Sequence, residues 1–462
     1  LEVHAEIDGS LKVVNRESGH CALKGGEHRN ARDACIFVTP QGACTATCFH
    51  PACANQTFQL EPAVTEAVFG DAVVDFSTDL KAAALFKAHC LRGRAACLLA
   101  NGKGMYMFDE ATGLWSDVHK NQISYMISCE LPNTIERLMA AQATGPEMDV
   151  ARKFENVADA NAALDRLLPM ITDARFADDL DAIAHVLSLA DGLLDLKTLE
   201  LRPRRLEDKQ TLCLTTPWPA EGADLPTPLI DSFFKQLLGI QDDACAREED
   251  RAKGRADDEG LLEFVRVLLG QAALTGSTDA QVLTFLYGSD AGNGKTALMR
   301  LLANLLEDYA LKCERKLITK CQPSNEGAAN PAMMSLQGRR FGWCEEFGEE
   351  EVMSDERIKA LTGGGKVRAR QLNTPEVEFD MTTSFALASN NKPTFAHLDQ
   401  AIMRRLVMIA CDTLFRDDTT EVEYDPANPR HRWRDPNIAE RLGTLEGKQQ
   451  LLVWLAVGAH AF

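Results

Sequence analysis

The stretch FLYGSDAGNGKTALMRLL, residues 285–302, constrains the fold more than any other part of this chain. An apolar run typical of a strand leads into a loop with three glycines, then Lys295 and Thr296, then a helical pattern. Backbone N–H groups freed by glycines at a helix N-terminus surround phosphate groups well. The stretch therefore predicts an α/β fold with a nucleotide site between a strand and a helix.

This loop departs from the usual phosphate-loop pattern G-x-x-x-x-G-K-[ST]. It is one residue longer, because Gly288 precedes Gly294 by six positions, and a carboxylate at Asp290 would repel a triphosphate unless it turned to solvent. Lys295 is expected to reach the phosphates, and the Thr296 hydroxyl to bind Mg²⁺. The expected nucleotide ligands are Gly288, Ser289, Gly292, Asn293, Gly294, Lys295, Thr296 and Ala297. A glycine-rich turn with an incidental lysine is the alternative.

Polar residues at the ends of later strand-like runs strengthen the nucleotide hypothesis. Glu345 and Glu346 close GRRFGWCEEF, where acidic side chains can hold Mg²⁺ and polarise a hydrolytic water. Asn390 follows an apolar strand and could contact the γ-phosphate. Arg405 precedes the strand LVMI, where it could reach the nucleotide of a neighbouring subunit. Each has an ordinary surface or turn interpretation alone, and their order along the chain favours a site.

Composition limits the classes of protein that remain. A length of 462 residues predicts several domains, about two to four. No apolar run is long enough to span a membrane, and no signal segment opens the chain, so we expect a soluble, intracellular protein without a membrane partner. The net charge of −19 excludes a global basic surface, so any contact with nucleic acid must be local. The 14 cysteines predict reduced thiols, with metal binding where they cluster.

With these motifs the chain resembles superfamily 3 helicases of the AAA+ class, of the primase-helicase type found in poxviruses and other large DNA viruses. The resemblance covers roughly residues 75–462, and includes GLWSDV and LSLADGLLDLKTLELRP, which are similar to the helicase-associated domain of that family. It implies an α+β helicase-associated domain over 71–235 and an AAA+ P-loop motor over 236–462. It also implies ATP and Mg²⁺ bound between subunits of a homo-oligomeric ring, a hexamer in this family. The family's GGD is GGG here, at 363–365.

A basic strand follows those three glycines. Lys366, Arg368 and Arg370 alternate, as expected for one face of a strand. From the residues alone this is an exposed basic hairpin. The resemblance implies that Lys366 and Arg368 grip single-stranded DNA inside the ring, with Arg370 structural or a further contact.

A cluster of cysteines and histidines lies near the N-terminus. Cys21 with His28 and Cys48 with Cys53 form two pairs that suit one tetrahedral Zn²⁺. Cys35, Cys44 and His50 compete as ligands by spacing, and unligated thiols are the plain alternative.

The four cysteine and histidine positions resemble the zinc element near the C-terminus of archaeo-eukaryotic primases of the herpesvirus and primase-polymerase type, which implies a small zinc module over 1–70. The chain opens at Leu1, not Met, and no primase carboxylate motif is present. We therefore expect the tail of a primase, with the catalytic domain upstream in a longer chain or on a partner.

The sequence thus predicts an ATP-driven DNA helicase that moves along single-stranded DNA at a replication fork. One rival is a catalytically weak scaffold that binds nucleotide and DNA and recruits a primase. Another is a P-loop kinase, which lacks support because no lid or acceptor site is evident. Stimulation of ATP hydrolysis by DNA separates the three.

Overall fold

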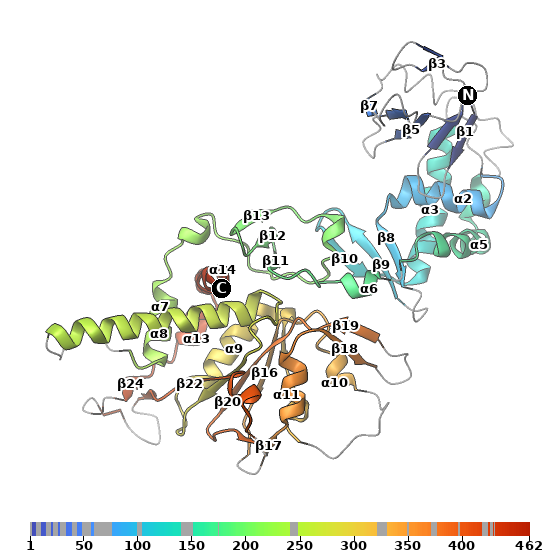
Figure 1. Ribbon diagram of the computed structural model, residues 1–462. Coiled ribbons are helices and arrows are strands. Elements are labelled where there is room, and N and C mark those ends of the chain that lie inside the picture. The colour runs from blue at the N-terminus through green and yellow to red at the C-terminus, as the bar shows by residue number, and fades with distance from the viewer. Residues whose placement is uncertain are drawn as a thin grey trace. The chain divides into compact units, whose positions relative to one another are not determined.

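The computed structural model describes residues 76–98, 104–139, 151–173, 175–240, 248–320, 330–348, 351–370, 377–395, 398–417, 424–425, 428 and 430–462, together with seven short strands before residue 60. Of those strands, and of residues 139 and 248–257, only the backbone is described. The chain divides into two compact units, the first holding 1–109 and 115–176, the second 110–114 and 177–462 (Figure 1). The boundary expected after residue 235 falls inside the second unit.

The first unit begins with an antiparallel sheet in the order β1-β2-β5-β6-β7 and a separate β3–β4 pair. These strands span Glu2–Ala5 (β1), Leu11–Val14 (β2), His20–Cys21 (β3), Gly26–Glu27 (β4), Ala34–Val38 (β5), Cys44–Cys48 (β6) and Thr57–Gln59 (β7). Then follow α2 (Asp79–Phe86), the π turn η2 (Lys87–Leu91), β8 (Ala95–Leu98), β9 (Gly104–Asp109), β10 (Leu114–Asp117), α3 (Lys120–Met139) and α5 (Val157–Leu167). Their apolar faces form one core around the fully buried Phe86, Ile127 and Leu164.

The short helix α6 (Phe176–Asp179) crosses the boundary between the units, and the second unit then forms a three-stranded antiparallel sheet of β11 (Val186–Leu189), β12 (Gly192–Asp195) and β13 (Glu200–Arg202). Helices α7 (Pro228–Leu237) and α8 (Glu248–Leu274) lead into a five-stranded sheet. Its order is β15-β16-β20-β14-β22, and each pairing is parallel. The strands are β14 (Leu283–Tyr287), β15 (Ala310–Lys312), β16 (Phe341–Glu345), β20 (Ser384–Ser389) and β22 (Leu406–Ala410). The α/β class predicted from the sequence is confirmed.

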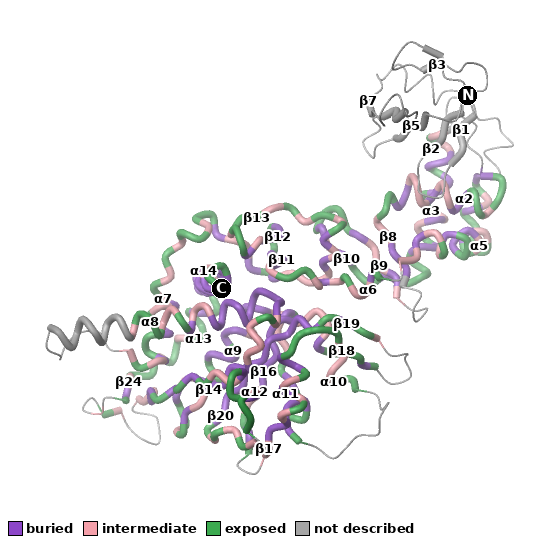
Figure 2. Tube along the Cα trace, viewed as in Figure 1, coloured by how far each residue is buried: buried purple, intermediate pink, exposed green. Residues whose placement is uncertain are grey.

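Both faces of this parallel sheet are covered, which explains why its strands read as continuous apolar runs (Figure 2). Because side chains alternate along a strand, Leu283 and Phe285 enter the core on one face, and Leu286 enters the core on the other. The core on the face that Leu286 enters also contains apolar residues of α9 (Lys295–Leu306) and α14 (Leu445–Ala461). The buried positions of α9 recur at helical spacing.

Smaller elements surround the sheet. Three two-stranded pairs are β17 (Val352–Met353) with β21 (Thr394–Phe395), β18 (Lys366–Ala369) with β19 (Val377–Asp380), and β23 (Leu414–Arg416) with β24 (His431–Trp433). The remaining α-helices are α10 (Pro331–Met334), α11 (Asp355–Thr362), α12 (Gln400–Met403) and α13 (Ile438–Gly443). Among the helices described above, none is long and apolar enough to cross a lipid bilayer.

Candidate nucleotide-binding site

The predicted phosphate loop joins the carboxyl end of β14 to the first residue of α9. Gly292 and Gly294 have φ angles of +76° and +82°, in the left-handed range that favours glycine. A Cβ at Gly294 would also lie 2.7 Å from Leu237 Cδ1 and 3.1 Å from Phe415 Cε2, so a larger residue there would have to displace these side chains. The loop therefore brings its backbone close to the start of α9, whose first N–H groups have no partner within the helix. This geometry suits an anionic phosphate ligand.

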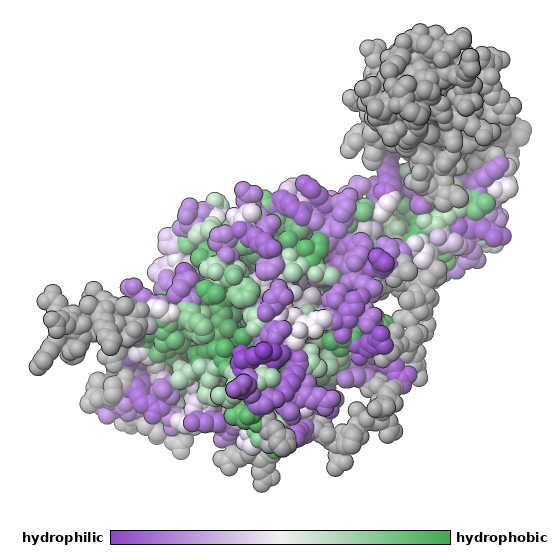
Figure 3. Space-filling view, in the orientation of Figure 1, coloured by the Kyte–Doolittle hydropathy of each residue, from purple (hydrophilic) through white to green (hydrophobic). Residues whose placement is uncertain are grey.

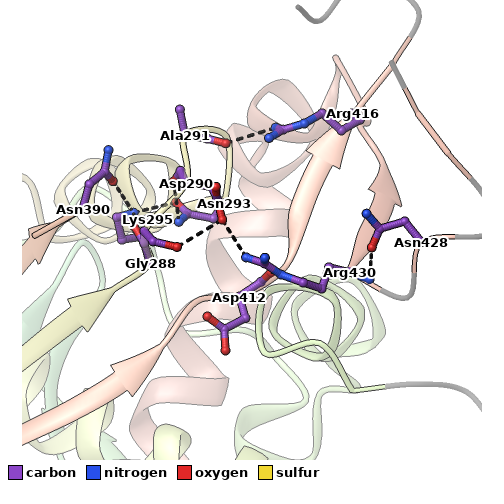
Figure 4. A network of polar contacts seen from close by, with 11 residues as sticks. Gly288, Asp290, Ala291, Asn293, Lys295, Asn390, Asp412, Arg416, Asn428 and Arg430 are labelled. Carbon is purple, nitrogen blue, oxygen red and sulfur yellow. Dashed lines mark hydrogen bonds and ion pairs between the residues drawn. The ribbon is translucent and has the colours of Figure 1, made fainter. Parts of the chain in front are cut away.

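Lys295 is the centre of the polar network at this loop. The side chain is buried, with 5% of the residue exposed. Its ammonium donates to Gly288 O at 2.9 Å, Asn293 Oδ1 at 2.8 Å and Asn390 Oδ1 at 2.7 Å (Figure 4). Burial lowers the pKa of Lys295 from its ordinary value. The structure thus brings together Lys295 and Asn390, which the sequence placed after two different strands.

The meeting of Lys295 and Asn390 follows from the order of the strands. β14 and β20 are parallel neighbours, and Tyr287 at the end of one pairs with Ser389 at the end of the other. After β14 the chain runs to the edge strand β15. After β20 it runs to the opposite edge strand β22, so the connections that follow β14 and β20 lead in different directions. In open α/β sheets, ligands bind at such a point, beyond the carboxyl ends of the strands.

The two acidic residues after β16 differ in their surroundings. Glu345 Oε2 accepts from Lys312 Nζ at 2.9 Å, and its side chain is only 10% exposed. Its other oxygen, Oε1, is buried without a hydrogen-bond partner among the described residues. A buried carboxylate oxygen that lacks a donor fits a role as a cation ligand. Glu346 is exposed and has a φ of +60°. Thr296 is exposed on the first turn of α9, which begins at the same edge of the sheet, so a ligand there can reach its side chain.

Sequence reasoning missed a group of contacts from β23 and β24. Three consecutive loop residues bond to this strand pair or to the residue before β24, and Figure 4 shows the bonds of the first two, Asp290 and Ala291. The bonds run from Arg430 Nη2 to Asp290 Oδ2 (2.7 Å), from Arg416 Nη1 to Ala291 O (3.1 Å) and from Phe415 N to Gly292 O (2.8 Å). The hydrogen bond from Arg430 holds the pKa of Asp290 below its usual value. The carboxylate that seemed to conflict with phosphate binding is thus paired with a guanidinium.

The basic strand predicted to contact DNA forms an antiparallel pair, β18 with β19. Lys366 lies opposite Asp380, and Arg368 donates to Glu378 Oε1 at 3.1 Å. Lys366, Arg368 and Arg370 are all exposed. The connection between the two strands, 371–376, lies outside the described residues. The alternation expected from the sequence therefore places Lys366 and Arg368 on the same face of β18.

Arg405 has a different environment from the one its predicted role requires. It is 8% exposed, and its guanidinium donates to Ala401 O at 2.8 Å and Gln281 Oε1 at 3.2 Å. Its carbonyl accepts from Leu283 N, at the amino end of β14, whereas the loop leaves the carboxyl end of that five-residue strand. The separation of about 16 Å exceeds the reach of an arginine, so Arg405 does not contact its own chain's loop.

Its neighbour Arg404 is exposed. In Figure 3 the surface around α11 is largely hydrophilic, whereas Leu398 and Met403, just before and at the end of α12, are each 57% exposed.

The predicted zinc ligands lie in the part of the chain whose side chains the structure does not describe. Cys21 and Cys48 lie on β3 and β6, of which only the backbone is described, and His28 and Cys53 lie outside the described residues. Elsewhere, in the part of the chain with described side chains, no cluster of three or more histidine, cysteine or acidic residues is arranged to hold a metal ion. The zinc site stays a prediction.

Comparison with known proteins adds an independent observation. Residues 83–239 match the protein family described as D5 N terminal like. Over 274 residues the chain is 35% identical to the C962R protein of African swine fever virus (strain Badajoz 1971 Vero-adapted), whose name describes it as a primase. Over 340 residues it is 23% identical to the L207/L206 protein of Acanthamoeba polyphaga mimivirus, whose name describes it as a helicase.

These matches cover 57% and 70% of this chain but only 25% and 33% of the two relatives, so the chain spans about a quarter to a third of their length. Among solved structures, the apo A form of the NrS-1 C-terminal region aligns with 81% of this chain and 70% of its own, at 12% identity. Its TM-score of 0.39 carries no structural inference. The chain is thus similar to a D5 N-terminal-like family over 83–239 and, over part of their length, to viral proteins named as a primase and as a helicase.

Proposed function

We propose that this chain is the ATP-driven motor of a viral-type primase-helicase, a superfamily 3 helicase of the AAA+ class. It moves along single-stranded DNA at a replication fork as a homo-oligomeric, hexameric ring. The observation that carries the proposal is the contact between Lys295 and Asn390 at the carboxyl edge of the parallel sheet. The primase and helicase names of the relatives supply the replication context.

The residues at this edge divide the work on ATP. Backbone N–H groups from Gly292 to Thr296 cradle the phosphates, and the Lys295 ammonium exchanges its carbonyl and amide acceptors for phosphate oxygens. Thr296 and Glu345 would hold Mg²⁺, which would neutralise negative charge on the phosphates. Glu345 or Glu346 orients the attacking water, and Asn390 contacts the γ-phosphate.

The hairpin of β18 and β19 supplies the contact with DNA. Its exposed cations, Lys366 and Arg368, lie opposite the exposed carboxylates Asp380 and Glu378, so DNA phosphates would compete with these carboxylates for the two cations. A ring that is acidic outside and basic at its pore attracts the phosphodiester backbone only where it must move it. The relatives' names and the exposed hairpin support this assignment.

Lys366→Ala tests the hairpin. We expect weaker binding of single-stranded DNA and ATP hydrolysis that is uncoupled from unwinding. The slope of log K for DNA against log salt concentration should become shallower by about one unit. Lys359→Ala is the control, because it removes a nearby lysine whose ammonium is engaged by Asp399 at 2.6 Å. Unchanged DNA affinity and salt slope in Lys366→Ala would assign DNA binding to another surface.

Zinc removal tests the N-terminal module. Cys48→Ser or Cys53→Ser should release one metal ion and unfold the first 60 or so residues, since a structural zinc supplies roughly 10 kcal/mol or more of apparent folding free energy. Cys129→Ser is the matched control, because that cysteine is free and exposed. Elemental analysis that finds much less than about one zinc per wild-type chain would count against the module.

A direct assay separates the motor from the scaffold. One contact favours the scaffold hypothesis. Lys312 pairs with Glu345, and this pairing would slow ATP hydrolysis if it kept Glu345 from Mg²⁺ or water. The measurement is the rate of ATP hydrolysis with and without single-stranded DNA. Stimulation by DNA supports the motor, whereas nucleotide binding without stimulated turnover supports a scaffold that recruits a primase domain, from the same longer chain or from a partner.

A further inference from the structure

The longer phosphate loop carries its own negative charge next to two arginines, one at the end of β23 and one immediately before β24. Asp290 Oδ2 accepts from Arg430 Nη2 at 2.7 Å, and Arg416 donates to the next residue of the loop. The Asp290 and Arg430 side chains are 42% and 44% exposed. An exposed ion pair of this kind is held only weakly. It can therefore open when a stronger acceptor approaches.

Arg430 is linked to Lys295, at the predicted phosphate position, through a short chain of hydrogen bonds. Asn293 Nδ2 donates to Asp290 O at 2.8 Å, and Asn293 Oδ1 accepts from Lys295 Nζ at 2.8 Å. A single asparagine thus connects the residue that pairs with Arg430 to the lysine at the centre of the site (Figure 4). The guanidinium and the ammonium flank the same loop.

The Arg430 guanidinium retains capacity for a further ligand. Its Nε donates to Asp412 O at 2.8 Å, and its Nη2 donates to Asp290. A guanidinium has five N–H donors, so three have no partner among the described residues. The contact with Asp412 anchors the side chain at one end and leaves the fork of the guanidinium directed at the loop. Phosphate oxygens match this fork better than a single carboxylate oxygen does.

We infer that Asp290 and the triphosphate of a nucleotide compete for Arg430. Arg430 is then a phosphate ligand supplied by the same chain, and Asp290 is a built-in competitor that lowers nucleotide affinity and favours release. The inference rests on the proposed nucleotide site and adds to it a residue that no phosphate-loop pattern contains. It also gives the acidic residue of the loop a role.

The experiment measures the Kd of a ribose-labelled fluorescent ATP analogue with Mg²⁺ on the full chain. Arg430→Gln should weaken binding by roughly tenfold or more, because a charge-assisted hydrogen bond to phosphate is lost. Asp290→Asn should tighten binding by about three- to fivefold, because the competing partner is removed. In the double variant the gain from Asp290→Asn should disappear, since there is no guanidinium left to release.

The double variant separates three explanations. Pure repulsion between Asp290 and phosphate predicts that the gain persists or grows when Arg430 is absent, which would overturn the competition. A purely structural tether predicts that both single variants weaken binding, and that the double variant is no worse than either, which would also overturn it.

Thermal unfolding of each variant without nucleotide shows whether the fold is intact. Arg430→Lys keeps the charge but not the fork, so its Kd should fall between those of wild type and Arg430→Gln.

The same strand pair offers a matched control. Arg434 is 54% exposed and pairs with Asp417 at 3.7 Å, so Arg434→Gln and Asp417→Asn remove the same charges from a neighbouring ion pair. Neither should move the Kd. A wild-type chain that does not bind the analogue contradicts the nucleotide site itself, whereas wild-type binding that Arg430→Gln leaves unchanged contradicts only the role of Arg430.

Discussion

Replacing Lys295 with alanine is expected to abolish ATP hydrolysis and to weaken nucleotide binding strongly. The ammonium is buried, lies among three oxygen acceptors and is the loop cation that we expect to contact the phosphates. A charge-assisted contact of this kind is worth on the order of 2 kcal/mol or more, and its loss removes stabilisation where negative charge develops. Steady-state ATPase rates and the Kd for the nucleotide measure the effect.

Two further variants make the Lys295 result specific. Lys295→Met keeps most of the side-chain volume, so it separates loss of charge from loss of packing. Lys392→Ala removes a lysine whose ammonium lies 5.5 Å from the centre of the Tyr287 ring, at the same edge of the sheet, and should retain activity. Wild-type ATPase in a folded Lys295→Ala chain would remove the nucleotide site from the proposal.

Loss of Arg405 is the second large effect that we expect. An arginine supplied to a neighbour's nucleotide contributes roughly 10³ to 10⁵ in rate in related NTPases. Arg405→Ala chains alone and Lys295→Ala chains alone should therefore be inactive. A mixture should regain part of the activity, because some interfaces then pair an intact loop with an intact arginine. The measurement is ATPase activity after subunit exchange, which an independent label verifies.

The burial of Arg405 sharpens this experiment. Its side chain must leave Ala401 O and Gln281 Oε1 to reach a neighbour, whereas Arg404 is already exposed. Arg404→Ala is therefore tested in parallel, and thermal unfolding is recorded for both variants. An Arg405→Ala chain that unfolds early and is not rescued by mixing has lost a packing residue. Rescue of Arg404→Ala in the same mixture would then assign the neighbour's contact to Arg404.

Much of the candidate site could be predicted because its signals are local in sequence. Strand β14, the glycine-rich loop and helix α9 follow one another directly, and each leaves a pattern that a short window contains. The alternation of Lys366 and Arg368 likewise predicted a strand with both cations on one face.

The sequence by itself therefore determined the order of strand, loop and helix, the glycines that the loop requires and the lysine at its end. Only the tertiary structure decided which distant groups meet there. Asp290 and Arg430 are 140 positions apart, and Lys295 and Asn390 are 95 apart, so no local pattern could pair them. Strand order brings Asn390 to the loop, and the β23–β24 pair brings Arg430 to it. The physical reason is that hydrogen bonds and ion pairs depend on distances of a few ångströms, and long-range packing, not sequence spacing, sets those distances.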